Sequence, residues 1–77
     1  HLEYPAPEVV DINSVIERNI AQLSRLLTEG QHIQLKLKDN LPRGYIDPQQ
    51  FLRIVSSIVK NSSEAMPTEG TVEIFTD

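Results

Sequence analysis

The stretch covering residues 47–66 constrains the fold most, because it carries the signals of one complete amphipathic helix. Asp47 is a good helix cap, and Pro48 suits the first helical position, where the missing N–H has no intrahelical partner. Met66 precedes a proline and therefore avoids helical angles, so the helix is expected to end there. Between these points apolar residues recur at helical spacing and predict a buried stripe: Phe51, Ile54, Val55, Ile58 and Val59.

A second amphipathic helix is expected nearer the N-terminus. Asn13 or Ser14 is the predicted cap, and Ser14 with Glu17 fits a capping box, in which each side chain satisfies a free backbone N–H. Gly30 supplies the stop, because glycine adopts the left-handed conformation without a steric penalty. The apolar residues of this helix follow at helical spacing: Val15, Ile16, Ile20, Leu23, Leu26 and Leu27.

Short segments between and around the helices have the character of strands. Residues 8–12 suit an edge strand, and the run 33–37 alternates apolar and polar side chains. Residues 45–46 add a brief extended piece, and residues 70–76 form a closing strand. The order β-α-β-(β)-α-β predicts an α/β (α+β) two-layer sandwich, with both apolar helix faces on one side of a mixed sheet. Residues 1–7 contain two prolines and no periodicity, which indicates a linker.

The composition argues against several classes of protein. The 77 residues include no cysteine, so neither a disulfide nor a thiolate metal site is available to stabilise the chain. The net charge is −4 and the basic residues are scattered singly, so we expect no nucleic-acid binding. Neither a signal peptide nor a long apolar run is seen, which predicts a cytoplasmic segment without direct membrane contact.

Polar residues follow one edge of the second predicted helix. Ser57, Asn61 and Glu64 fall at i, i+4 and i+7, so they form one line beside the apolar stripe, and Ala65 lies one step further on that edge. Such a line is typical of a helix that forms one wall of a cleft. The neutral carbonyl oxygen of an asparagine suits Mg²⁺, which prefers oxygen ligands. Helix chemistry alone favours a simpler interpretation, a frayed last turn, because Ser and Asn gravitate to helix ends.

The order of these features resembles the N-box region of the GHKL ATPase superfamily, and most closely the ATP-binding domain of bacterial sensor histidine kinases. Such domains have an Asp-Pro cap, an apolar helix with a late Asn, an Ala-Met helix end and a Gly-Thr start to the next strand. The matching residues here are Asp47-Pro48, Asn61, Ala65-Met66 and Gly70-Thr71. The likeness extends upstream to about Val9.

The resemblance implies a partial Bergerat-type fold. Residues 1–7 would be the linker from an upstream dimerisation and phosphoacceptor region, and residues 8–77 the N-terminal portion of the catalytic domain. The Asp-x-Gly-x-Gly motif and the ATP lid of the family would lie beyond Asp77.

The resemblance also assigns roles to residues. Asn61 would coordinate Mg²⁺, and Glu64, Ala65 and Lys60 would lie at the ATP site. Ser57 occupies the first N-box position, where the family carries Asn or an acidic residue, and its hydroxyl is a poorer base and a shorter ligand. An aromatic residue that stacks on adenine in some kinases is replaced by Ala65.

In function, the resemblance implies that the longer protein binds Mg²⁺-ATP and transfers the γ-phosphoryl group to a His of its own dimerisation domain. A response regulator would be the downstream partner, and the longer protein can be membrane-anchored. The 77 residues alone are expected to bind ATP weakly or not at all, and to self-associate through an unpaired sheet edge. Two alternatives stay open: another GHKL enzyme of the anti-sigma-factor kinase type, and a non-enzymatic α/β interaction module.

Overall fold

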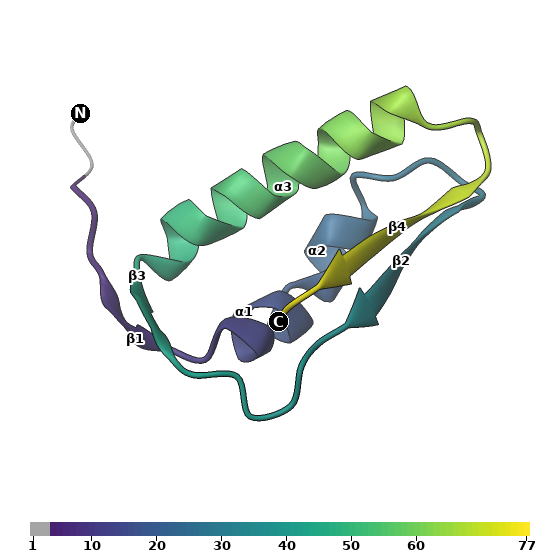
Figure 1. Cartoon of the computed structure of the whole chain (residues 1–77). Coiled ribbons are helices and arrows are strands. Elements are labelled where there is room, and N and C mark those ends of the chain that lie inside the picture. Colours follow the sequence, from purple (N-terminus) through teal and green to yellow (C-terminus); the bar gives the residue numbers. More distant parts are fainter. Residues whose placement is uncertain (1–3) are drawn as a thin grey trace.

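The computed structural model describes residues 4–77, and residues 1–3 of the expected linker lie outside this range (Figure 1). Residues 4–7 have no regular structure. The elements follow in the order β1 (Glu8–Val10), α1 (Ile12–Arg18), α2 (Ile20–Ser24), β2 (Gln31–Lys36), β3 (Gly44–Ile46), α3 (Pro48–Ala65) and β4 (Gly70–Phe75). No helix in the described part of the chain is long and apolar enough to cross a membrane.

The mixed α/β class and the predicted order of elements are confirmed. The prediction of a single mixed sheet is wrong for the described residues. The strands form two separate two-stranded sheets. β1 pairs antiparallel with β3, with Val9 opposite Tyr45, whereas β2 and β4 run parallel, with Ile33 opposite Val72. α3 makes the crossover between the parallel strands and lies alongside both α1 and β4 (Figure 1).

The first predicted helix is present, but its cap and its continuity differ from the prediction. Asp11 is the N-cap, because its carboxylate accepts a hydrogen bond from Ser14 N at 3.3 Å. Asn13 is instead drawn to Lys38 O, to which its amide donates at 2.8 Å. The helix breaks at Asn19, which has φ −111° and ψ 12° and donates its side-chain N–H to Val15 O at 2.7 Å. A side chain that bonds the backbone one turn earlier competes with the helical pattern in this way.

The predicted apolar spacing of this helix is confirmed. Val15, Ile16 and Leu23 are buried and form the core together with Val10 from β1 and Val59 from α3. Gly30 has the left-handed conformation expected of it, with φ +91°, but the prediction that it ends the helix is wrong, because α2 ends at Ser24 and Gly30 directly precedes β2.

The long helix α3 begins and ends where the sequence predicts. Asp47 caps it by accepting from Gln49 N and Gln50 N, Pro48 is its first residue, and Met66 follows in an extended conformation. The prediction of its buried stripe is only partly confirmed. Val59 is 1% exposed, and Phe51 and Val55 are half-buried, but Ile54 and Ile58 are 57% and 59% exposed.

The difference in burial has a geometric cause. The buried line of α3 runs through Val55, Val59 and Ser63, which lie at i, i+4 and i+8 on one side of the helix. Ile58 is about 100° around the helix from Val59, and Ile54 is further away. Because β2 and β4 form only a two-stranded sheet, they cover one side of α3 and leave these isoleucines in solvent.

A buried amide fixes the C-terminal end of α3. Gln31, the first residue of β2, donates from Nε2 to Ser63 O at 3.2 Å and to Pro67 O at 2.9 Å. Its Oε1 accepts from Thr28 N at 3.1 Å and from the Ser63 hydroxyl at 2.5 Å. All four hydrogen-bonding positions of the amide are therefore used. This network joins the loop after α2, the start of β2 and the end of α3.

Candidate functional site

The residues predicted from the N-box resemblance all lie on the exposed side of α3. Ser57, Lys60, Asn61, Glu64 and Ala65 are exposed. Their helical spacing is kept, because α3 is continuous from Pro48 to Ala65. Within residues 4–77, the side chains of Ser57, Asn61 and Glu64 form no hydrogen bond with the rest of the chain. These polar groups are thus accessible to a ligand.

The surroundings of Asn61 differ from the expected border of a buried stripe. Asn61 and Ala65 follow Ile58 by three and seven residues, so they continue the outward line that Ile54 begins. We refer to this line as the outer strip of α3 (Ile54, Ile58, Asn61 and Ala65). The strip combines apolar surface with one amide and contains no charged side chain.

The capacity of the outer strip for a metal is limited. No group of three or more His, Cys, Asp or Glu side chains in the described part of the chain is placed to hold a metal ion. Asn61 offers one accessible amide oxygen, and Glu64 lies one turn further along the helix. The donor set is compatible with an ion that takes its other ligands from water and phosphate, as Mg²⁺ does.

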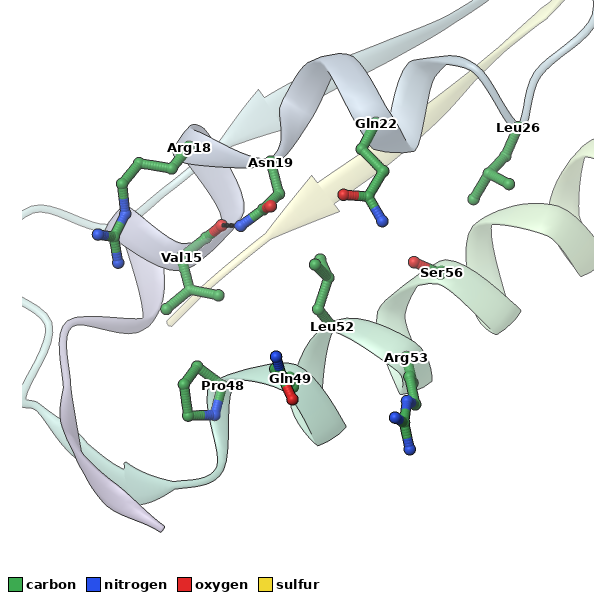
Figure 2. A pocket seen from close by; sticks show the side chains of 10 residues that line it. All are labelled: Val15, Arg18, Asn19, Gln22, Leu26, Pro48, Gln49, Leu52, Arg53 and Ser56. Carbon is green, nitrogen blue, oxygen red and sulfur yellow. Dashed lines mark hydrogen bonds between the residues drawn. The ribbon is translucent and has the colours of Figure 1, made fainter. Parts of the chain in front are cut away.

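A groove on the described surface lies elsewhere, between α1/α2 and α3 (Figure 2). It has a volume of about 880 Å³. Figure 2 shows Val15 and Leu26 from one wall and Leu52 from the other pointing into the space between the helices. Polar residues complete the lining: Arg18, Asn19, Gln22, Gln49, Arg53 and Ser56, together with Pro48.

This groove has an apolar floor and a polar rim that includes two arginines and no carboxylate. Its volume lies within the range typical of small-molecule sites. Arg18 donates from Nε to Ser14 O at 3.3 Å, which holds its side chain along α1. None of the residues of the outer strip lines this groove, so the predicted site and the groove are separate places.

Two smaller depressions flank the N-terminal end of the fold. One of about 450 Å³ lies against β1 and α1, next to Asp11 and Glu17. The other, of about 280 Å³, separates residues 4–7 from α3 and is lined by Pro5, Tyr45 and Ile54 among others. Ile54 is the one residue of the outer strip that reaches it.

The most strongly perturbed acid is Asp47, at the start of α3. Its carboxylate accepts from Ala6 N at 3.0 Å, from Gln49 N at 3.0 Å and from Gln50 N at 3.3 Å. The hydrogen bond from Ala6 is the largest cause that lowers the pKa of Asp47 below 3.8, and the positive charge of Arg53 acts in the same direction. The carboxylate therefore stays ionised throughout the physiological range.

Sequence reasoning missed both the groove and the buried amide. Arg18 and Gln22 lie at the rim of the groove, but no periodicity in the sequence shows that a second helix runs beside them. Gln31 had a usable signal. It shares the parity of Ile33 and Leu35 in an alternating strand, so its side chain points to the same inner face.

Comparisons with protein-family models, with curated proteins and with solved structures found no match to this chain.

Proposed function

We propose that this chain is the N-terminal portion of the ATP-binding catalytic domain of a sensor histidine kinase, with a partial Bergerat-type fold. The observation that carries the proposal is the placement of Asn61. It lies one turn before the end of a capped helix, its amide is exposed, and a turn and a parallel strand follow directly. An amide that merely filled a frayed last turn would sit in a helix that loosens at this point, whereas α3 continues to Ala65.

In this proposal each residue of the helix has a distinct role. The carbonyl oxygen of Asn61 binds Mg²⁺ that is shared with the triphosphate, and Glu64 supplies a second oxygen or holds a metal-bound water. Ser57, one turn earlier, orients a water or a phosphate by hydrogen bonding. Lys60 approaches the phosphates as a flexible positive charge. Ala65 leaves room for the base without stacking on it.

Mg²⁺ neutralises charge on the phosphates during phosphoryl transfer, while the protein contributes mainly positioning. The outer strip suits a positioning role, because its apolar residues offer surface to a base and its amide offers an oxygen ligand to the metal. The γ-phosphoryl group would pass to a His of the dimerisation domain and then to a response regulator. Both partners are proposals that rest on the resemblance.

The proposal is tested by replacing Mg²⁺ with paramagnetic Mn²⁺, which broadens nearby amide signals even when binding is weak. Mn²⁺ with ATP, added to ¹⁵N-labelled chain, is expected to broaden the amides around Asn61 and Glu64 more than Mn²⁺ alone. Asn61→Ala should remove the ATP-dependent part, and Gln34→Ala, on the exposed face of β2, should not. ATP-dependent broadening that is confined to other elements, or that Asn61→Ala leaves unchanged, would contradict the proposal.

A second candidate function is a non-enzymatic interaction module. The groove between α1/α2 and α3 favours it, because its volume of about 880 Å³ is large enough for a ligand or a partner side chain and none of the outer-strip residues lines it. In that case, ATP-dependent broadening would be absent from α3, and a partner would perturb the methyl signals of Leu26 and Leu52 instead.

A further inference from the structure

The groove between α1/α2 and α3 differs in charge from the chain as a whole. Asp and Glu outnumber Lys and Arg by 11 to 7 in the sequence, yet no carboxylate lines the groove. Its charged lining residues are Arg18 on one wall and Arg53 on the other. A hollow lined by charge of one sign attracts ligands of the opposite sign, so this groove favours an anion.

Arg18 is held in place and keeps most of its donors available. Its Nε donates to Ser14 O at 3.3 Å, one turn earlier on α1. A guanidinium has five N–H donors in a planar fork, so the two terminal nitrogens remain for a ligand. Among the described residues Arg18 forms no ion pair, although Asp11 and Glu17 line the neighbouring depression. This fork matches a carboxylate, which it binds through two parallel hydrogen bonds.

Arg53, on the opposite wall, shares its charge with the start of α3. The pKa of Asp47 is lowered chiefly by the hydrogen bond from Ala6, and the positive charge of Arg53 adds to this effect. Arg53 therefore already has a carboxylate close to it. The head of an anionic ligand is assigned to Arg18 for this reason.

The floor of the groove is apolar and incompletely covered. Val15 is buried, but Leu26 and Leu52 are only half-buried, and Figure 2 shows both leucines pointing into the space between the helices. An apolar ligand that covers them removes their surface from water, which favours binding. The wall formed by α3 runs from Pro48 to Ser56, a length of about 12 Å. This length and the volume of about 880 Å³ suit a small molecule better than a long partner helix.

We propose that the groove between α1/α2 and α3 binds a small carboxylate with an apolar body. The terminal nitrogens of Arg18 hold the carboxylate, and the body extends past Leu52 toward Leu26 (Figure 2). The inference does not rest on the proposed kinase function, because neither Ser57 nor Asn61 lines the groove. The Mn²⁺ experiment and the experiment below therefore fail independently.

Octanoate is the probe, and the methyl signals of Val15, Leu26 and Leu52 report its binding to ¹³C-labelled chain. Saturable shifts are expected at these methyl groups. Octanamide has the same body without the charge, and butanoate has the same charge with a shorter body. Each is expected to bind about tenfold more weakly or worse. Equal affinity for octanoate and octanamide overturns the proposal, and so do octanoate shifts confined to other methyl groups, such as those of Ile54 and Ile58.

A pair of variants tests the assigned arginine. Arg18→Gln should weaken octanoate binding about tenfold or more, because it removes a charged donor fork. Arg43→Gln is the matched control, since it removes the same charge from an exposed position that does not line the groove. Its affinity should equal that of the wild type, and circular dichroism confirms the fold of both variants. An equal loss in both variants shows unspecific attraction and overturns the proposal, as does wild-type affinity in Arg18→Gln.

Discussion

Replacing Gln31 by leucine is expected to destabilise the fold by about 2–4 kcal/mol, although leucine is apolar and similar in size. Gln31 is 6% exposed, and its amide serves Thr28 N, Ser63 O, the Ser63 hydroxyl and Pro67 O. Leucine satisfies none of them. A buried polar group left without a partner costs about 1–3 kcal/mol, but the Ser63 hydroxyl can turn to a carbonyl of its own helix, and water reaches some of the others.

The loss expected for Gln31→Leu is a large share of the free energy of unfolding of the whole domain. A small domain has about 5–15 kcal/mol of total stability, and a chain of this length belongs near the lower limit. Urea unfolding followed by circular dichroism gives the free energy of unfolding for each variant. The slope against urea should stay constant, which shows that the native and unfolded states keep their compactness.

Three further variants make the prediction specific. Ser63→Ala removes one bond to Gln31 Oε1 and should cost about 1 kcal/mol. Gln34→Leu, on the exposed face of the same strand, should stay within about 0.5 kcal/mol of the wild type. Gln31→Glu places a carboxylate oxygen against two carbonyls, which raises the pKa of the introduced group. Its stability is therefore highest below the unfolded-state pKa and falls as the pH rises through the folded-state pKa. If Gln31→Leu and Gln34→Leu have equal stability, the buried network does not determine how β2 and α3 are joined.

Other perturbations have equally definite outcomes. Leu23 is fully buried, so Leu23→Ala should cost about 2–5 kcal/mol in urea unfolding, and a loss below about 1 kcal/mol would show that the core is loosely packed there. Ile54 and Ile58 form an exposed apolar ridge, so a chain with Ile54→Glu and Ile58→Glu should be monomeric at concentrations where the wild type self-associates; equal sedimentation of the two proteins would place any self-association elsewhere. The pKa of Asp47 is lowered in the folded state, chiefly by the hydrogen bond from Ala6, so its contribution to stability is complete at neutral pH and is lost as the pH falls below 3.8 through the folded-state value. Asp47→Asn should therefore flatten the acid side of the stability curve, and an unchanged acid slope would refute the assignment.

Local signals predicted most of the secondary structure because they act within a few residues. Asp47 with Pro48 fixed the start of α3, and Met66 before Pro67 fixed its end. The alternation through Ile33 and Leu35 predicted β2, which the structure confirms. These features depend on backbone geometry that each residue sets for itself and its neighbours.

The errors come from features that depend on tertiary contacts. Asp11 became the N-cap of α1 because Asn13 is used by Lys38, which lies 25 positions away. The exposure of Ile54 and Ile58 depends on how many strands cover α3, and helical periodicity gives the width of a stripe but not the extent of what covers it.

The candidate site was predictable only in part. Helical spacing placed Ser57, Asn61 and Glu64 on one side of α3, and the structure keeps them there. The groove beside α1 and α2 depends on how two helices pack, and the bond from Ala6 to Asp47 depends on how a segment without periodicity returns to a helix start. Neither has a signature within a single window of sequence.

Under the proposed function, the role of Asn61 is tested most directly by autophosphorylation of a complete kinase that contains this segment. The variant Asn61→Ala is compared with the wild type and with Lys60→Ala, using ATP labelled at the γ-phosphate and circular dichroism to confirm the fold. Transfer by Asn61→Ala is expected to fall by about a hundredfold or more, with an unchanged fold and a smaller effect of Lys60→Ala. Phosphoryl transfer at the wild-type rate in Asn61→Ala would contradict the proposal that this amide binds the metal–nucleotide complex.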